Sequence, residues 1–161
     1  MFARLQERTT PNGPTDASFV IVLVHRDGTT SEVSASKLNH LAERELRVYG
    51  EGGSYVSLTT DVQARDIFAG RRPVDDPQGW GHEPESAWGT LRTARGARRV
   101  PSEQGSWVRY YELFAQAVRT GWPPPVSAAE AGQVLAVLDA ARLSAASGEA
   151  VVPTPAGAAR G

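Results

Sequence analysis

Few side chains in this chain are of the types that carry chemistry, and they are scattered. The histidines are His25, His40 and His82, and their spacing matches no zinc-binding pattern. Lys37 is the single lysine, and it lies in a polar segment that we expect to be a strand. The chain has no cysteine and no Gly-x-Ser-x-Gly motif of a nucleophile elbow. We therefore predict no catalytic residue and no metal site, and we expect solvated or hydrogen-bonding roles for the histidines.

Three other residues are candidates for contact with a small-molecule substrate. Trp80 and Gly81 lie in a long loop rich in Pro, Gly and Asp, at residues 70 to about 86, and long loops in compact domains are often functional. The alternative for Trp80 is an anchor that fixes the loop to the core, which is the commoner role of a tryptophan in such a loop. Tyr111 is expected on the buried face of a helix, with its ring in the core and its hydroxyl bonded to the backbone.

Composition limits the partners that this chain could have. It is 40% hydrophobic and 22% charged over 161 residues, with a net charge of -1, which is typical of one globular domain. Because no basic stripe is present, we expect no nucleic acid and no membrane surface as partner. Arg71 and Arg72 could contact a phosphate or carboxylate, but we expect both side chains to be solvated. No apolar run approaches the roughly 20 residues of a membrane helix, and no signal peptide is evident. Together with the lack of cysteine this predicts the cytoplasm, and the Ala, Gly, Arg and Pro content suggests a bacterial gene.

Alternation of apolar and polar residues and the breakers between them predict a sheet. The expected strands are 2–8, 19–24, 29–38, 45–49, 54–58, 88–93 and 97–100. Asp27-Gly28 favours a tight hairpin, and residues 61–69 are helical at most. Residues 153–161 have no apolar pattern, and we expect them to be a disordered tail after a domain of residues 1–152.

Two helices with clear ends follow the strands. The first is expected to end at Gly121 and to bury one stripe: Trp107, Tyr110, Tyr111, Phe114 and Val118. Three prolines separate it from the second, which begins at a capping box of Ser127 and Glu130 and ends at Gly148 as a left-handed cap. The second helix is expected to bury Ala131, Val134, Leu135, Leu138 and Ala145. Val151 and Val152 are expected to form a short returning strand.

Strands first and helices after predict an α+β domain: a mostly antiparallel open β-sheet with a C-terminal helical hairpin packed on one face. The predicted strand at residues 19–24 alternates Phe19, Ile21 and Leu23 with Val20, Val22 and Val24, so both of its faces are apolar. Helices cover only one face, and the second needs another cover.

The region from Gly105 to Ser144 resembles the C-terminal signature of the Gfo/Idh/MocA oxidoreductases. The resemblance rests on a glycine, nearby aromatic residues, an Ala-Val-Arg-Thr-Gly run, Pro-Pro-Val and an Ala-Ala-Arg-x-Ser ending: Gly105, Trp107, Tyr110, Tyr111, residues 117–121, 124–126 and 140–144. Less specific matches in the same order extend it to residues 1–152, among them Asp16, residues 48–54 and Trp80-Gly81.

The resemblance implies a two-domain NAD(P)-dependent enzyme acting on a sugar or polyol. This chain would be its C-terminal substrate-pocket and dimerisation domain, with Trp80 and Gly81 near the mouth of the cleft and a homodimer formed through the open sheet face. The sequence contains no Gly-x-Gly-x-x-Gly, no Glu-Lys-Pro and no Gly-x-His-x-x-Asp motif, so we expect the N-terminal Rossmann domain to be missing. We expect no cofactor-binding residue and no catalysis by the chain alone, and a truncated gene is one explanation. The alternatives are a stand-alone binding or oligomerisation module without enzymatic activity, and a pseudogene product that barely folds.

Overall fold

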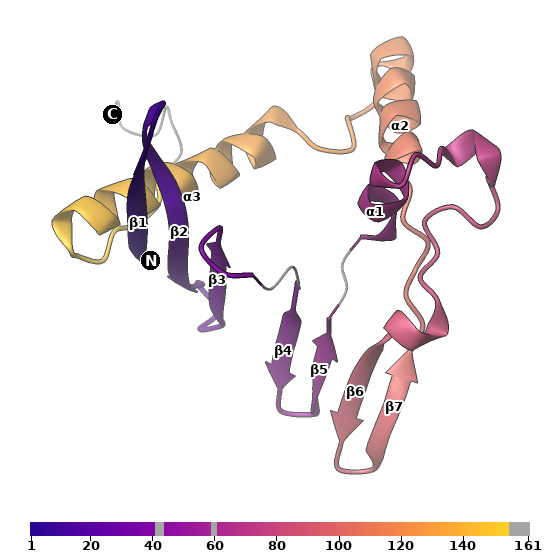
Figure 1. Cartoon of the computed structure of the whole chain (residues 1–161), viewed down its shortest axis with the longest axis horizontal. Coiled ribbons are helices and arrows are strands. Elements are labelled where there is room, and N and C mark those ends of the chain that lie inside the picture. The colour runs from indigo at the N-terminus through magenta and orange to yellow at the C-terminus, as the bar shows by residue number, and fades with distance from the viewer. Residues whose placement is uncertain (41–43, 59–60, 155–161) are drawn as a thin grey trace. The chain divides into compact units, whose positions relative to one another are not determined.

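The computed structural model describes residues 1–40, 44–58 and 61–154 (Figure 1). The chain divides into two compact units. The first unit contains residues 1–40 and 123–161, and the second contains residues 41–122. The predicted tail at residues 153–161 lies almost entirely outside the described residues, of which Pro153 and Thr154 are the last and belong to no helix or strand.

The first unit is a three-stranded antiparallel sheet with one helix. Its strands are β1 (Phe2–Thr10), β2 (Gly13–Val24) and β3 (Thr30–Ser36), in the order β1-β2-β3, and α3 (Ala128–Ser147) packs against β1. Both hairpin turns use a glycine with positive φ, Gly13 at 102° and Gly28 at 87°. The polar segment after Asp27-Gly28 thus returns antiparallel to β2, as predicted.

The core of the first unit is small because its helix contacts the sheet through small residues. Ala3, Ile21 and Ala141 form the buried cluster, with larger apolar side chains partly buried around it. On α3 the buried residues are Ala136, Ala140, Ala141 and Ser144. The predicted buried face of α3 is therefore wrong: Val134, Leu135 and Leu138 are exposed. Small side chains allow α3 to approach β1 closely enough for the Ala3 amide to donate to Ser144 Oγ at 3.0 Å.

The predicted ends of α3 are confirmed. Ser127 Oγ accepts from the Glu130 amide at 3.2 Å while the Glu130 carboxylate accepts from the Ser127 amide at 2.8 Å, and Gly148 ends the helix with φ of 74°. The short strand predicted at Val151 and Val152 is not formed. Instead Val151 exchanges two backbone hydrogen bonds of 2.8 Å with Met1, which join the segment after α3 to the start of β1.

The second unit is a four-stranded antiparallel sheet followed by a helix. Its strands are β4 (Leu46–Gly50), β5 (Gly53–Ser57), β6 (Gly89–Thr93) and β7 (Gly96–Val100), in sequential order. Between β5 and β6 lie α1 (Val62–Phe68) and two single-turn helices, η1 (Pro73–Asp75) and η2 (Glu85–Ala87), and α2 (Trp107–Thr120) follows β7. Ser106 caps the start of α2, and Gly121 ends it with φ of 71°, as predicted.

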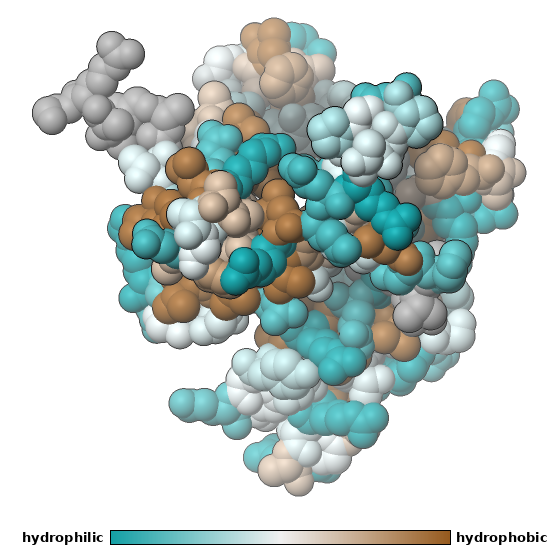
Figure 2. All heavy atoms as spheres, turned by 60° about the vertical axis from the view of Figure 1, so that its left-hand side comes forward, coloured by the Kyte–Doolittle hydropathy of each residue, from teal (hydrophilic) through white to brown (hydrophobic). Residues whose placement is uncertain are grey.

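The structure confirms the α+β class with antiparallel sheets. The strands form two sheets rather than one, and the two C-terminal helices belong to different compact units. Large hydrophobic side chains reach the surface of the described chain in several places (Figure 2). No helix among the described residues is long and apolar enough to cross a lipid bilayer.

Candidate functional site

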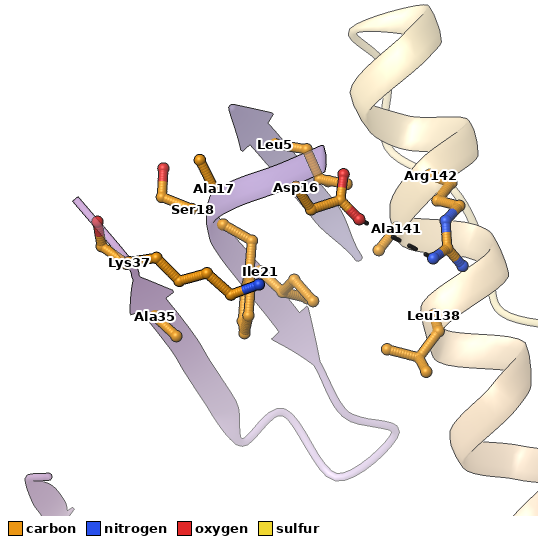
Figure 3. Close-up of a pocket in the computed structure, with 12 residues that line it drawn as sticks. Leu5, Asp16, Ala17, Ser18, Ile21, Ala35, Lys37, Leu138, Ala141 and Arg142 are labelled. Carbon is orange, nitrogen blue, oxygen red and sulfur yellow. Dashed lines mark ion pairs between the residues drawn. The ribbon is translucent and has the colours of Figure 1, made fainter. Parts of the chain in front are cut away.

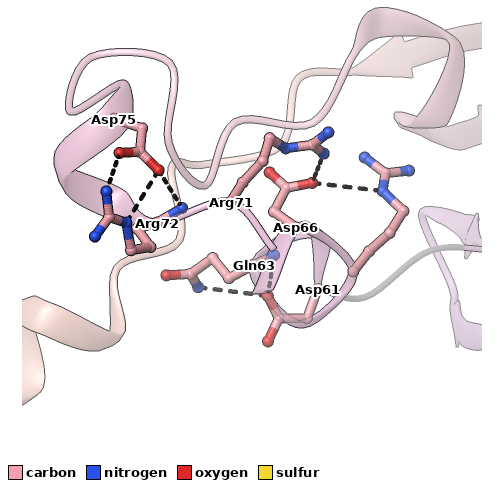
Figure 4. Close-up of polar contacts among 7 residues, drawn as sticks. Asp61, Gln63, Asp66, Arg71, Arg72 and Asp75 are labelled. Atoms are coloured by element: carbon pink, nitrogen blue, oxygen red, sulfur yellow. Dashed lines mark hydrogen bonds and ion pairs between the residues drawn. The ribbon is translucent and has the colours of Figure 1, made fainter. Parts of the chain in front are cut away.

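A buried glutamine organises the loop that carries Trp80 and Gly81. Gln63 is 3% exposed in the first turn of α1, where Asp61 caps the helix by accepting from the Gln63 amide at 2.9 Å. The side-chain oxygen of Gln63 accepts from Trp80 Nε1 at 3.2 Å and from the Trp107 amide at 3.0 Å. Its side-chain nitrogen contacts Asp61 Oδ1 at 3.4 Å (Figure 4), so both ends of the carboxamide have partners. Gln63 thereby connects α1, the long loop and the start of α2.

Two glycines bring the loop against the segment before α2. The Gly105 amide donates to the Gly81 carbonyl at 2.9 Å, and Gln104 Nε2 donates to the Trp80 carbonyl at 2.8 Å. Gly81 has φ of 76°, and a Cβ atom there would lie 1.9 Å from the Gly105 carbonyl oxygen. Only glycine fits such an approach, because both the backbone angle and the contact exclude a side chain.

A pocket of about 370 Å³, here called the polar pocket for its carboxylates, lies beside this crossing in the second unit, and its wall also includes Leu46, Val62 and Pro101. Gly81 and Gly105 contribute to its wall, and its polar groups are carboxylates and hydroxyls: Asp61, Glu83, Glu103, Tyr55, Ser57 and Ser102. None of the described residues that line it is Lys, Arg or His. Ser102 Oγ donates to Glu83 Oε2 at 2.5 Å, which fixes one carboxylate in the wall. The pocket offers hydrogen-bond acceptors and negative charge to a ligand.

The three predicted substrate contacts occupy different environments. Trp80 is 7% exposed with its indole nitrogen bonded to Gln63, so the structure gives it the role of an anchor. Gly81 lines the polar pocket. Tyr111 lies on α2, is 70% exposed, and contacts the Tyr110 ring edge-on at a centroid distance of 5.5 Å. Tyr111 is not part of the pocket wall, and its predicted place in the core is wrong.

The same correction applies to the whole predicted stripe on α2. Its members, Trp107, Tyr110, Tyr111, Phe114 and Val118, are all exposed, and Ala117 is the buried residue of this helix. Their rings contact one another instead: Tyr110 stacks on Phe114 at 6.4 Å between centroids. The spacing predicted an apolar face correctly, but nothing among the described residues of the second unit buries it.

Other candidate residues have structural partners. Arg71 pairs with Asp66, and Arg72 pairs with Asp75 at 3.0 Å at the start of η1 (Figure 4). His25 Nε2 lies 2.8 Å from Ser31 Oγ. Within the described ranges, no group of three or more His, Cys, Asp or Glu residues could hold a metal ion.

Sequence reasoning missed Gln63 and Asp61, although one signal was present. Asp61 stands directly before Val62, the first residue of α1, and an Asp immediately before the first apolar residue of a helix is the pattern of an N-cap. The bonds from Gln63 to Trp80 and Trp107 connect residues 17 and 44 positions apart, and no local pattern predicts them.

The fold is that of an α+β domain with antiparallel sheets, and the family match assigns it to the C-terminal part of oxidoreductases. Residues 3–154 match the family model described as the oxidoreductase family, C-terminal alpha/beta domain. Because the match covers most of the sequence, the chain belongs to the Gfo/Idh/MocA family as its C-terminal domain.

Individual relatives agree with this assignment. The scyllo-inositol 2-dehydrogenase (NADP(+)) of Bacillus subtilis is 33% identical over 99 residues, which are 59% of this chain and 27% of that protein. The structure of the oxidoreductase yvaA from Bacillus subtilis is similar with a TM-score of 0.79 and 26% identity, over 92% of this chain and 43% of that one. An oxidoreductase from Bacteroides fragilis gives a TM-score of 0.77 and 28% identity, over 92% and 45%. The chain thus spans less than half the length of these relatives.

Proposed function

We propose that this chain forms the substrate-pocket and dimerisation part of an NAD(P)-dependent oxidoreductase that acts on a sugar or polyol. The observation that carries the proposal is the family match over residues 3–154. Similarity to a dehydrogenase whose name gives scyllo-inositol and NADP(+) supports the substrate and cofactor classes. The polar pocket beside Gly81 is the surface that we assign to the substrate side.

We assign no dinucleotide site to the described residues. The nearest glycine cluster, Gly50, Gly52 and Gly53, lies at the hairpin between β4 and β5, where two antiparallel strands meet. A pyrophosphate needs amide donors at the start of a helix after a strand, and this turn offers no helix start. Accordingly we assign no step of hydride transfer to the residues of this chain.

The pocket's chemistry suits a neutral ligand with several hydroxyl groups. Carboxylates such as Asp61 and Glu103 accept hydrogen bonds from hydroxyls, and bonds to a charged acceptor are stronger than neutral ones. The same carboxylates repel a phosphate or carboxylate on the ligand, since the pocket wall contains no described cation to offset them.

Nuclear magnetic resonance can test this assignment on the chain alone. The chain has four tryptophans, so four indole signals are expected, and Trp80→Phe identifies the one beside the pocket. We expect scyllo-inositol at millimolar concentration to shift the Trp80 indole and the Gly81 and Gly105 amides, and glucose 6-phosphate to shift them less. Unchanged signals with the polyol, or equal shifts with the anion, would contradict the pocket assignment. Glu103→Gln should reduce the discrimination between the two ligands.

We further propose that the open face of the β1–β3 sheet meets a second copy. One face of β2 packs toward α3 through Ile21, while Val20 and Val24 on the other face are exposed. An apolar sheet face of this kind is stabilised when another surface covers it. Light scattering after size exclusion should give a dimer that Val20→Glu converts to a monomer. Val134→Glu, the same change at an exposed valine of α3, should leave the dimer intact; a monomeric wild-type chain would refute the proposal.

These experiments also distinguish the oxidoreductase assignment from the alternative function. A stand-alone binding or oligomerisation module predicts a stable dimer whose pocket does not respond to the polyol. A response of the pocket to scyllo-inositol favours the oxidoreductase assignment.

A further inference from the structure

A second pocket, of about 320 Å³, lies in the first unit between α3 and the sheet (Figure 3). Its floor is built from buried apolar residues, Ala17, Ile21 and Ala141, and its walls include Phe19 and Leu138. This volume is at the lower end of the range for small-molecule sites, roughly 300–1,000 Å³. The interior therefore suits a short hydrocarbon chain or one ring.

Charged side chains from β3 and α3 also line this apolar pocket. Figure 3 shows the Lys37 side chain running from the end of β3 toward Ile21, while Arg142 comes from α3 on the opposite wall. The Lys37 amide donates to the Ala17 carbonyl at 2.8 Å, which holds the lysine backbone at the pocket edge. Among the described residues no ion pair joins Lys37 to a carboxylate, and Lys37 is exposed, so its ammonium group can bind a ligand.

Asp16, the one carboxylate among the residues that line the pocket, neutralises only part of this charge. Asp16 Oδ2 lies 4.0 Å from Arg142 Nη2, and both side chains are more than half exposed. An exposed ion pair at this distance contributes little free energy, so Arg142 can pair with a ligand carboxylate in place of Asp16. With Lys37 and Arg142 positive and Asp16 negative, the charged residues that line the pocket sum to one positive unit.

We infer that this pocket binds a small amphiphilic monocarboxylate, with the apolar part against Ile21 and Ala141 and the carboxylate between Lys37 and Arg142. Charge complementarity selects this occupant: an apolar ligand without a charge leaves the two cations unused, and a cationic one is repelled by them. The inference goes beyond the proposed function, because this site lies in the first unit and contains none of the residues around Gly81.

Calorimetry with three ligands of equal chain length tests the inference on the intact chain. We expect octanoate to bind more tightly than octanol, and octanol more tightly than octylamine. Lys37→Gln should weaken octanoate binding about twofold to fivefold, the effect of one partly exposed ion pair, and leave octanol unchanged. Arg119→Gln, an exposed arginine of α2, is the matched control and should change neither.

Shape is tested independently of charge. Ala35 lines the pocket from an exposed position on β3, so Ala35→Leu should fill the pocket and abolish octanoate binding without disturbing the core. Ala131→Leu, at an exposed position of α3, should bind as the wild type does.

Several results would overturn the inference: no octanoate binding by the wild type, equal binding of all three ligands, or unchanged binding in Ala35→Leu. A pocket covered by a second copy would show as octanoate affinity that falls as protein concentration rises, and this result would overturn it as well.

Discussion

Replacement of Gln63 by leucine should lower the free energy of unfolding of the second unit. We expect a larger loss than for a leucine at any other glutamine of the chain. Leucine has a similar size but accepts no hydrogen bond, so the donors at Trp80 Nε1 and the Trp107 amide lose their partner. A buried donor left without an acceptor costs about 1–3 kcal/mol. The indole bond is buried and the amide bond only partly so, which gives a total loss of about 2–4 kcal/mol.

The position of the tryptophans makes the measurement specific. Trp80, Trp88, Trp107 and Trp122 all belong to the second unit, so urea unfolding followed by tryptophan fluorescence reports on that unit. Gln116→Leu is the matched control, because Gln116 is exposed on α2, and a surface substitution there should stay within about 0.5 kcal/mol.

The outcome also has a local signature. In Gln63→Leu the Trp80 indole proton should exchange with solvent faster than in the wild type, since its acceptor is gone. A loss below about 0.5 kcal/mol with an unchanged dependence on urea would refute the role of Gln63 as the connecting residue.

Three further predictions concern backbone, core and pH. Gly81→Ala should lower the free energy of unfolding of the second unit more than Gly70→Ala. Both glycines have positive φ, a backbone angle that costs another residue about 1–2 kcal/mol. Only the Cβ at position 81 would also meet a backbone carbonyl. Equal losses in urea unfolding would mean that the crossing at Gly81 opens without cost. Ser144→Ala should cost about 1–3 kcal/mol in unfolding followed by circular dichroism, because it leaves the buried Ala3 amide without its acceptor, whereas Ser147→Ala at an exposed position should cost less. Hydrogen bonds from the Ser127 amide and hydroxyl lower the pKa of Glu130, so this carboxylate stabilises α3 above its ordinary pKa near 4.5 and ceases to do so as pH falls through the lowered value. The difference in urea midpoint between the wild type and Glu130→Gln should accordingly be present at neutral pH and vanish in acid; a difference that persists in acid would contradict this explanation.

Features that depend on neighbouring residues were predictable from the sequence. The capping box at Ser127, the glycine caps at Gly121 and Gly148 and the turn at Asp27-Gly28 each involve groups within a few positions of one another. The hydrogen bonds of each feature join groups within a short segment, so they do not depend on how that segment packs against the rest of the chain.

Predictions of which helix face is buried failed because burial depends on the surface that the helix meets. On α3, the large residues Val134 and Leu135 suggested one face, yet the buried residues are small ones such as Ala140 and Ala141, and Ala141 packs with Ala3 and Ile21 of the sheet. Close approach to β1 at Ala3 leaves room only for small side chains, and the bond from the Ala3 amide to Ser144 fixes that choice. Hydrophobicity alone does not encode this preference for small volume.

Within one site, Trp80 was predictable from its neighbours in the sequence, whereas the role of Gln63 depends on residues far along the chain. The composition of the loop was enough to single out Trp80, because a tryptophan among glycines and prolines needs a place to pack. Its partner was hidden, since a glutamine on a short helix reads as a solvated residue until the loop and the start of α2 bring two donors to it. A polar residue of this kind is recognised only when every buried donor around it is assigned an acceptor. The two neighbours therefore have different roles: Trp80 is held by its hydrogen bond to Gln63, and Gly81 is part of the wall of the polar pocket.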